Sequence, residues 1–171
     1  MDDEPISAGG RGFLVARAQP GDADDILGIL EDAARWLEGR GIDQWHPGDY
    51  PRAPLLAVIA RGAAYLARGE GDPAGTLTVQ WEDVVTWGVM PPDGAYVHGF
   101  AVRRAYAGLG LGRALLDWAA RQAVAAGKTY LRLDCLASNL ALRAYYERAG
   151  FTLCGQVDEG ESALYERRLN S

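Results

Sequence analysis

The sequence feature that most constrains the fold is a glycine-rich turn between a strand and a helix. Residues 107–113 read Ala-Gly-Leu-Gly-Leu-Gly-Arg, after a strand predicted over 95–102 and at the start of a helix predicted over 110–126. Glycines let the backbone approach a ligand closely, and the free N–H groups of a helix's first turn attract an anion. The turn therefore predicts a phosphate-binding loop within a fold that mixes strands and helices.

Two common phosphate loops do not fit this turn. A Walker A loop needs Gly-Lys-Ser/Thr, whereas Arg113 and Ala114 follow the last glycine. The dinucleotide pattern GxGxxG would need glycine where Arg113 or Leu115 stands. That pattern also turns directly after its strand, whereas several residues separate Val102 from Gly108. The turn therefore belongs to another class of anion-binding loop.

Hydrophobic periodicity predicts the remaining elements. Apolar residues at helical spacing predict helices over 22–38, 52–61 and 139–149, and short apolar or alternating runs predict strands over 13–18, 64–68, 75–81, 129–135, 151–157 and 163–168. Residues 82–94 are expected to form an irregular connection and residues 1–11 a loose tail. The expected order is β-α-α-β-β-β-α-β-α-β-β, an α/β fold with a mixed sheet and one domain over residues 12–171.

Composition sets the class of protein. The chain has 171 residues, of which 49% are hydrophobic and 23% charged, as expected for one soluble globular domain. No apolar stretch is long enough to predict a membrane span, and the acidic start has no signal-peptide core. Two cysteines without a Cys-x-x-Cys spacing predict no metal site, and a reducing cytoplasm is the expected location.

The charge distribution is uneven along the chain. The net charge is −6, with −7 in residues 1–50 and +1 in residues 51–171. An acidic chain argues against nucleic-acid binding, which needs basic patches. It suits a cationic partner near the first fifty residues and an anionic ligand near the remainder. The alternative is that the acids simply solvate the first helix.

Three segments of the chain follow one another in an ordered set. Val97–Val102 is a strand, Tyr106–Leu116 contains the glycine-rich turn, and Asn139 precedes a Tyr146-Glu-x-x-Gly-Phe151 pattern. In this order and spacing they resemble the GNAT superfamily of N-acetyltransferases. The resemblance covers roughly residues 12–169. It implies a GNAT-like acyl-CoA N-acyltransferase fold, acetyl-CoA as the co-substrate and an amine as the acceptor, and it leaves a homodimer open.

The resemblance also implies which residues bind the acyl-CoA. These are Phe100, Ala101 and Val102 along the thioester, the loop residues Leu109, Gly110, Leu111, Gly112 and Arg113 around the pyrophosphate, and Asn139 and Tyr146 beside the pantetheine. One position departs from the family, because Ala107 stands where Arg or Gln is usual. Arg103, Arg104 or Arg113 would then supply the positive charge. The alternative for Asn139 is a helix N-cap.

The expected chemistry is direct attack of a neutral amine on the thioester. The resemblance selects Tyr146 over Tyr145 as the general acid that protonates the leaving thiolate, with packing in the core as the alternative. His98 is the candidate general base, because imidazole changes its charge near neutral pH. Glu82, Asp83, Asp134 and a chain of water molecules are the alternatives, because strand alternation would also permit His98 to point away from the site.

In this family the first two helices and their loop usually build the acceptor pocket. The acceptor is expected to contact Trp36, Gln44, Trp45 and His98. Aromatic faces and carboxylates suit a cationic amine. The alternative is that Trp45 only fixes the loop to the core. Two other functions stay open: an acyl-CoA sensor without turnover, and an acyltransferase acting on a protein amine.

Overall fold

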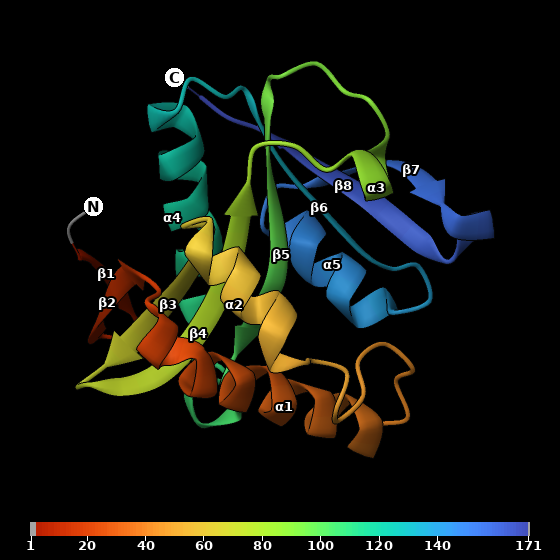
Figure 1. Ribbon diagram of the computed structural model, residues 1–171. Coiled ribbons are helices and arrows are strands. Elements are labelled where there is room, and N and C mark those ends of the chain that lie inside the picture. The colour runs from red at the N-terminus through yellow and green to blue at the C-terminus, as the bar shows by residue number, and fades with distance from the viewer. Residues whose placement is uncertain (1–2, 171) are drawn as a thin grey trace. The chain divides into compact units, whose positions relative to one another are not determined.

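The computed structural model describes residues 3–170, and its elements can be followed in Figure 1. The strands are β1 (Glu4–Ala8), β2 (Arg11–Arg17), β3 (Ala64–Gly69), β4 (Asp72–Gln80), β5 (Gly94–Val102), β6 (Tyr130–Leu136), β7 (Thr152–Val157) and β8 (Ser162–Arg168). The α-helices are α1 (Ala23–Gly39), α2 (Arg52–Ala60), α3 (Val84–Trp87), α4 (Leu111–Ala125) and α5 (Leu140–Arg148). Single 3₁₀ turns are η1 (Pro20–Asp22), η2 (Arg104–Tyr106) and η3 (Asp158–Gly160).

The fold is mixed α/β, as the sequence predicts. The strands follow the order β1-β2-β3-β4-β5-β6-β8-β7 in one sheet, with parallel and antiparallel pairs. The described residues divide into two compact units. The first unit comprises residues up to 78 with 99–115, and the second comprises 79–98 with 116 onward. Within residues 3–170 no helix combines the length and apolar character that a membrane span requires.

The expected loose tail over 1–11 is wrong where the structure describes it, and residues 1 and 2 lie outside the described part. Strand β1 pairs antiparallel with β2, from Glu4 opposite Val15 to Ala8 opposite Arg11. Gly9 and Gly10 have φ of +56° and +75°, which suits a two-residue hairpin turn. The strand is hard to predict because only the side chains at positions 6 and 8 are buried.

The first unit has a hydrophobic core between its helices and strands. Helix α1 contributes one apolar face, and α2, strands β3 and β5 and the residue after β2 supply the rest. The core residues are Ala18, Ala23, Ile26, Ile29, Leu30, Ile59, Ala64, Leu66 and Ala101. Burying a Leu or Ile side chain contributes about 1.5–3 kcal/mol. The core therefore holds α1 and α2 against the strand that leads into the glycine-rich turn.

The N-terminal hairpin also contacts the segment before that turn. The rings of Phe13 and Tyr106 meet edge to face with centroids 5.7 Å apart, and the Arg11 guanidinium lies 5.2 Å from the Tyr106 ring. A Cβ on Gly9 would lie 3.0–3.1 Å from atoms of Leu109. The turn of the hairpin therefore supports the predicted phosphate loop.

In the second unit the buried side chain of Arg132 on β6 joins several elements. It donates to Glu166 on β8 at 2.6 Å and to the Tyr96 hydroxyl on β5 at 2.9 Å, and it pairs with Asp93 at 3.1 Å. Its guanidinium lies 5.6 Å from the Trp87 ring. Arg132 is 2% exposed, so its charge relies on these partners.

The connection over 82–94 is more ordered than the sequence indicates. Helix α3 forms one turn within it, and Asp83 Oδ1 caps this turn by accepting a hydrogen bond from Thr86 N at 3.0 Å. The rings of Trp87 and Tyr96 meet edge to face at 5.8 Å. The helical turn is therefore fixed to β5 and to the Arg132 cluster.

Candidate active site

The glycine-rich turn has the geometry of an anion cradle. Gly108 and Gly110 have φ of +78° and +83°, and a Cβ at either would meet nothing within 4 Å. These positions therefore need glycine for backbone conformation rather than for space. Helix α4 begins at Leu111, so the first-turn N–H groups of residues 111–113 lack acceptors within the helix.

Two arginines before the turn are held differently. The backbone N–H of Arg104 donates to Asp32 Oδ2 at 2.8 Å, and its guanidinium lies 4.1 Å from the Trp36 ring. The side chain of Arg103 lies against Gly28 of α1, where a Cβ would come 3.2 Å from Nη2. Arg104 is exposed whereas Arg103 is half-buried, so Arg104 is better placed to offer its charge to a ligand.

Trp36, expected to contact the acceptor, lies between two cations. The Arg40 guanidinium is 4.8 Å from its ring, in addition to Arg104. The ring is half-buried. Its position connects α1 with the segment that precedes the glycine-rich turn.

His98 lies on β5, beyond the residues that pair with β6. The parallel pairing of β5 with β6 runs from Gly94 opposite Tyr130 to Tyr96 opposite Arg132. His98 follows two residues later, and one of its ring nitrogens lies within 4.8 Å of a carboxylate oxygen of Asp134 on β6. His98 therefore lies close to a carboxylate.

A second carboxylate reaches the same imidazole. Asp83 Oδ2 lies 3.0 Å from His98 Nε2, with the Asp83 side chain 8% exposed and the imidazole 31% exposed. The contact has the distance of an ion pair, yet among the described residues Asp83 Oδ2 has no hydrogen bond of good geometry. Catalytic hydrogen bonds are often poorly aligned before substrate binds. His98 is thus the accessible member of a cluster with two carboxylates.

Asp134 completes this cluster. One ligand atom each from Asp83, His98 and Asp134 lie within 4.8 Å of one another. Burial raises the pKa of Asp134, Asp83 and Asp158 raise it further, and His98 opposes the shift. A His with two carboxylates also suits a divalent cation, so a chelator control belongs in any test of this site.

Tyr146 is buried in an aromatic cluster of the second unit. It is 6% exposed, and its ring lies 5.8 Å from Phe151, 5.7 Å from Tyr145 and 6.2 Å from Tyr165. Burial is the main cause that raises the pKa of Tyr146 above its ordinary value, so the phenol stays protonated at neutral pH. The ring packs in the core, which is the alternative interpretation of Tyr146 given above. Its hydroxyl remains the candidate proton donor.

Asn139 is the N-cap of α5. Its Oδ1 accepts a hydrogen bond from Leu142 N at 3.1 Å, and the residue is 8% exposed. The capping alternative is therefore confirmed. An amide that caps with its oxygen still carries an NH₂ group, so the expected contact with pantetheine stays a prediction.

The loop after α1 combines aromatic rings with carboxylates. The rings of Trp45 and Tyr50 meet edge to face at 5.5 Å, and both pack against the core of the first unit. His46 Nε2 lies 2.7 Å from Asp43 Oδ1, and Glu31 accepts a hydrogen bond from Gly48 N at 2.8 Å. Trp45 therefore fixes a loop that also carries half-buried Gln44 and the exposed side chains of Asp43 and Asp49.

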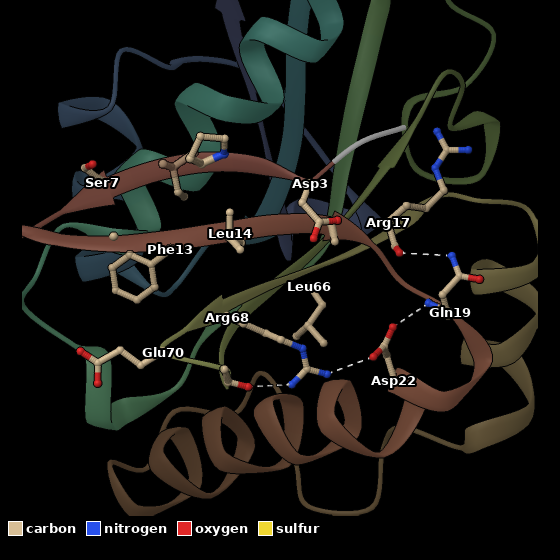
Figure 2. Close-up of a pocket in the computed structure, with 15 residues that line it drawn as sticks. Asp3, Ser7, Phe13, Leu14, Arg17, Gln19, Asp22, Leu66, Arg68 and Glu70 are labelled. Carbon is tan, nitrogen blue, oxygen red and sulfur yellow. Dashed lines mark hydrogen bonds and ion pairs between the residues drawn. The ribbon is translucent and has the colours of Figure 1, made fainter.

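A separate hollow of about 720 Å³ lies on the β1–β3 side of the first unit (Figure 2). Arg68 lines it and pairs with Asp22 at 3.0 Å and with Asp25 at 2.6 Å. The hydrogen bond from Arg68 to Asp25 is the main cause that raises the Arg68 pKa. None of the predicted site residues lines this hollow, and of its two arginines, Arg17 and Arg68, the second is already paired with two carboxylates. We therefore place no catalytic function there.

The predicted cofactor residues are divided between the units. Phe100, Ala101 and Val102 and the loop over 109–113 belong to the first unit, whereas Asn139 and Tyr146 belong to the second. Gly99 has φ of +53°, so β5 changes direction between His98 and the predicted thioester segment. The sequence named Asp83 and Asp134 only as alternative bases, and the Arg132 cluster that fixes α3 was not expected.

The fold and the anion cradle define a class of acyl-CoA-dependent transferase, and comparison with known proteins specifies it. Residues 30–151 match the acetyltransferase (GNAT) family. The uncharacterized N-acetyltransferase YesJ of Bacillus subtilis (strain 168) is 31% identical over 167 residues, covering 94% of this chain and 92% of that protein. The chain belongs to the GNAT family and is an N-acetyltransferase.

Two solved structures agree with this assignment. A GNAT-family acetyltransferase from Listeria monocytogenes 4b F2365 has a TM-score of 0.84 and 31% identity, covering 97% of this chain and all of that one. The PaiA N-acetyltransferase from Thermoplasma acidophilum, solved in complex with coenzyme A, has a TM-score of 0.74 and 17% identity. The coverage there is 91% of this chain and 98% of that one. At 17% identity, the likeness to the Thermoplasma acidophilum structure shows a shared fold alone.

Proposed function

We propose that the protein transfers the acetyl group of acetyl-CoA to the amine of a small cationic metabolite, in the cytoplasm and without a metal. The family membership supports acetyl transfer, and the coenzyme A bound to the PaiA relative supports the donor. The cation is supported by the acidic first fifty residues and by the carboxylates around Trp45. A homodimer stays a prediction.

In the proposed acetyl-CoA site, backbone N–H groups bind the negative charges of the donor. The N–H groups of residues 109–113 bind the pyrophosphate at the start of α4, with Arg104 in place of the side chain that Ala107 lacks. The N–H groups of Phe100, Ala101 and Val102 stabilise the oxyanion that forms when the amine attacks the thioester carbonyl. Asn139 contacts the pantetheine.

Proton movements complete the reaction. An ammonium ion must lose one proton before its nitrogen can attack, and His98 accepts that proton. The carbon–nitrogen bond forms, the carbon–sulfur bond breaks, and the Tyr146 hydroxyl gives its proton to the departing thiolate. The second proton of the amine then restores the phenol, and His98 returns its own proton to water. Trp36, Gln44, Trp45 and His98 contact the acceptor.

The observation that carries this proposal is the pairing of His98 with Asp83 and Asp134 directly before the segment proposed to hold the thioester. A half-buried imidazole with two carboxylates close to it favours a proton acceptor for an ammonium ion over a purely structural histidine.

The test is release of free thiol from acetyl-CoA in the presence of a panel of amines, polyamines and amino acids. We expect turnover with a cationic amine and unchanged turnover after treatment with a chelator. Binding of coenzyme A in calorimetry without turnover on any amine would favour an acyl-CoA sensor, which the missing side chain at Ala107 makes the second candidate. Turnover only on a peptide amine would favour a protein acceptor.

A further inference from the structure

The two carboxylate oxygens of Asp83 make different contacts. Oδ1 accepts the hydrogen bond from Thr86 N at 3.0 Å and so caps α3. Oδ2 lies 3.0 Å from His98 Nε2 and, among the described residues, has no hydrogen bond of good geometry. A buried carboxylate oxygen without a donor destabilises the site unless a cation or a proton faces it. The imidazole of His98 is the group that faces it.

The position of Asp83 is fixed from the opposite side. Helix α3 is held through Trp87, whose ring packs edge to face on Tyr96 at 5.8 Å and lies 5.6 Å from the Arg132 guanidinium. Arg132 is buried and bound to Glu166 at 2.6 Å. The carboxylate therefore stands on a rigid support rather than on a mobile loop.

The contact also constrains the tautomer of the imidazole. A carboxylate is an acceptor only, so a hydrogen bond from His98 to Asp83 needs a proton on Nε2. The 3.0 Å approach becomes such a bond when the ring aligns in the substrate complex, and Nδ1 then carries the basic lone pair. The charged groups that face the imidazole are Asp83 from the start of α3 and Asp134 from β6, while Asp158 from η3 acts on Asp134.

We propose that Asp83 is a positioning residue for acetyl transfer, which orients His98 through Nε2 and stabilises the imidazolium that forms when Nδ1 takes the acceptor's proton. This inference rests on the proposed function, because it assigns His98 its partner in that reaction. Asp134 lies close to the same imidazole and offers the second negative charge to the incoming ammonium ion.

The substitution Asp83→Asn separates the cap of α3 from the negative charge beside His98. Asparagine keeps an oxygen for the Thr86 cap and removes the negative charge beside His98. Asp83→Ala removes both. Glu161→Gln is the matched control, because it removes one exposed carboxylate of the same unit. We expect Asp83→Asn to keep the melting temperature of the wild type and Asp83→Ala to lower it.

The decisive measurement is the imidazole titration followed by NMR in the full chain. The chain has two histidines, so the variant His46→Gln leaves His98 as the one signal. We expect Asp83→Asn to move the titration midpoint of His98 toward acid, because the variant removes a negative charge 3.0 Å from Nε2. Glu161→Gln should leave it in place. A midpoint that moves no more than in the control overturns the inference.

The kinetic arm uses acetyl-CoA and whichever amine of the panel is turned over. We expect Asp83→Asn to lower kcat at least tenfold and to move the acid limb of kcat/KM in the same direction as the NMR midpoint. Unchanged kcat with a shifted midpoint would overturn the role in acetyl transfer. If the wild type turned over no amine, the proposed function would be overturned instead. The NMR titration needs no turnover, so it tests the contact between Asp83 and His98 separately from that function.

Discussion

The guanidinium carbon of Arg104 lies 4.1 Å from the centroid of the Trp36 ring. A cation over a tryptophan ring at the protein surface gains about 0.5–1 kcal/mol, so the half-buried Trp36 holds Arg104 in place. The backbone N–H of the same arginine donates to Asp32 on α1. Helix α1 thereby orients the arginine that precedes the anion cradle.

The first prediction follows from this contact. Arg104→Gln and Trp36→Ala should each raise the KM for acetyl-CoA about 3- to 10-fold, corresponding to one charge-assisted contact, with little change in kcat. Arg35→Gln, an exposed arginine one residue before Trp36, is the control. Steady-state kinetics with both substrates varied measures each KM. Trp36→Ala should also raise the KM of the acceptor, which Trp36 is proposed to contact, and a rise in that KM alone would contradict the role of the ring in holding Arg104.

The hairpin turn offers a pair of matched glycines. Gly9 and Gly10 both have positive φ, so alanine at either should lower the free energy of unfolding by about 1–2 kcal/mol. A Cβ at Gly9 would press on Leu109 of the cradle, whereas a Cβ at Gly10 would meet nothing within 4 Å. Gly9→Ala should therefore raise the KM for acetyl-CoA and Gly10→Ala should not. Equal effects in calorimetric titration with coenzyme A would contradict the contact.

The parts of this site that sequence predicts are those encoded by local spacing. The glycines at 108 and 110 and the Tyr146-to-Phe151 pattern each lie within a short run, and the elements around them formed as expected. Strand β1 was missed because a short strand with Pro5 and two buried side chains carries too little alternation. Its pairing with β2 supplies the stability that its own sequence does not show.

The cluster of Asp83, His98 and Asp134 could not be predicted from local sequence patterns. His98 and Asp134 come close together because β5 pairs with β6 over residues 94–96 and 130–132, just before each of them. Asp83 reaches His98 because α3 is anchored by the Arg132 cluster. Neither relation follows from the spacing of residues along the chain, so the sequence left His98 and both carboxylates as alternatives for one role.

Gly94 provides a test of that anchor. A Cβ at Gly94 would collide with Nη1 of Arg132, and the guanidinium is already fixed by its partners. Gly94→Ala should lower the free energy of unfolding by about 1–3 kcal/mol, the usual result of overpacking. Gly39→Ala, at the end of α1 with open space and ordinary φ, should be neutral or slightly stabilising. Urea denaturation measures both, and equal loss would contradict the collision.

Tyr146→Phe tests the proton donor while keeping the ring. The aromatic contacts with Phe151 and Tyr165 survive the change, so the melting temperature should stay within a few degrees of the wild type. Loss of a general acid should lower kcat about 100-fold. Because burial raises the pKa of Tyr146, the wild-type rate should show no alkaline decrease from this group below pH 10. An unchanged kcat would leave Tyr146 as a packing residue.

The last prediction concerns stability against pH at Asp134. Burial raises the pKa of this carboxyl above its ordinary value of 3.8, so the folded chain holds its proton to a higher pH than the unfolded chain does. The folded state then binds more protons within that window, and stability decreases as pH rises through it. Above this pH range the ionised carboxylate lowers the free energy of unfolding by a constant amount.

Asp134→Asn removes that contribution, since the amide has no charge to desolvate. Its free energy of unfolding relative to the wild type should therefore increase as pH rises from below 3.8 toward neutral and then level off. Denaturation series at several pH values measure this difference, with Glu161→Gln as a carboxylate that should show no such trend. The same variant should lose at least tenfold in kcat/KM for a cationic amine. A gain in stability together with a loss of activity is expected of a carboxylate kept for function, and a variant that lost both would show that Asp134 serves the fold.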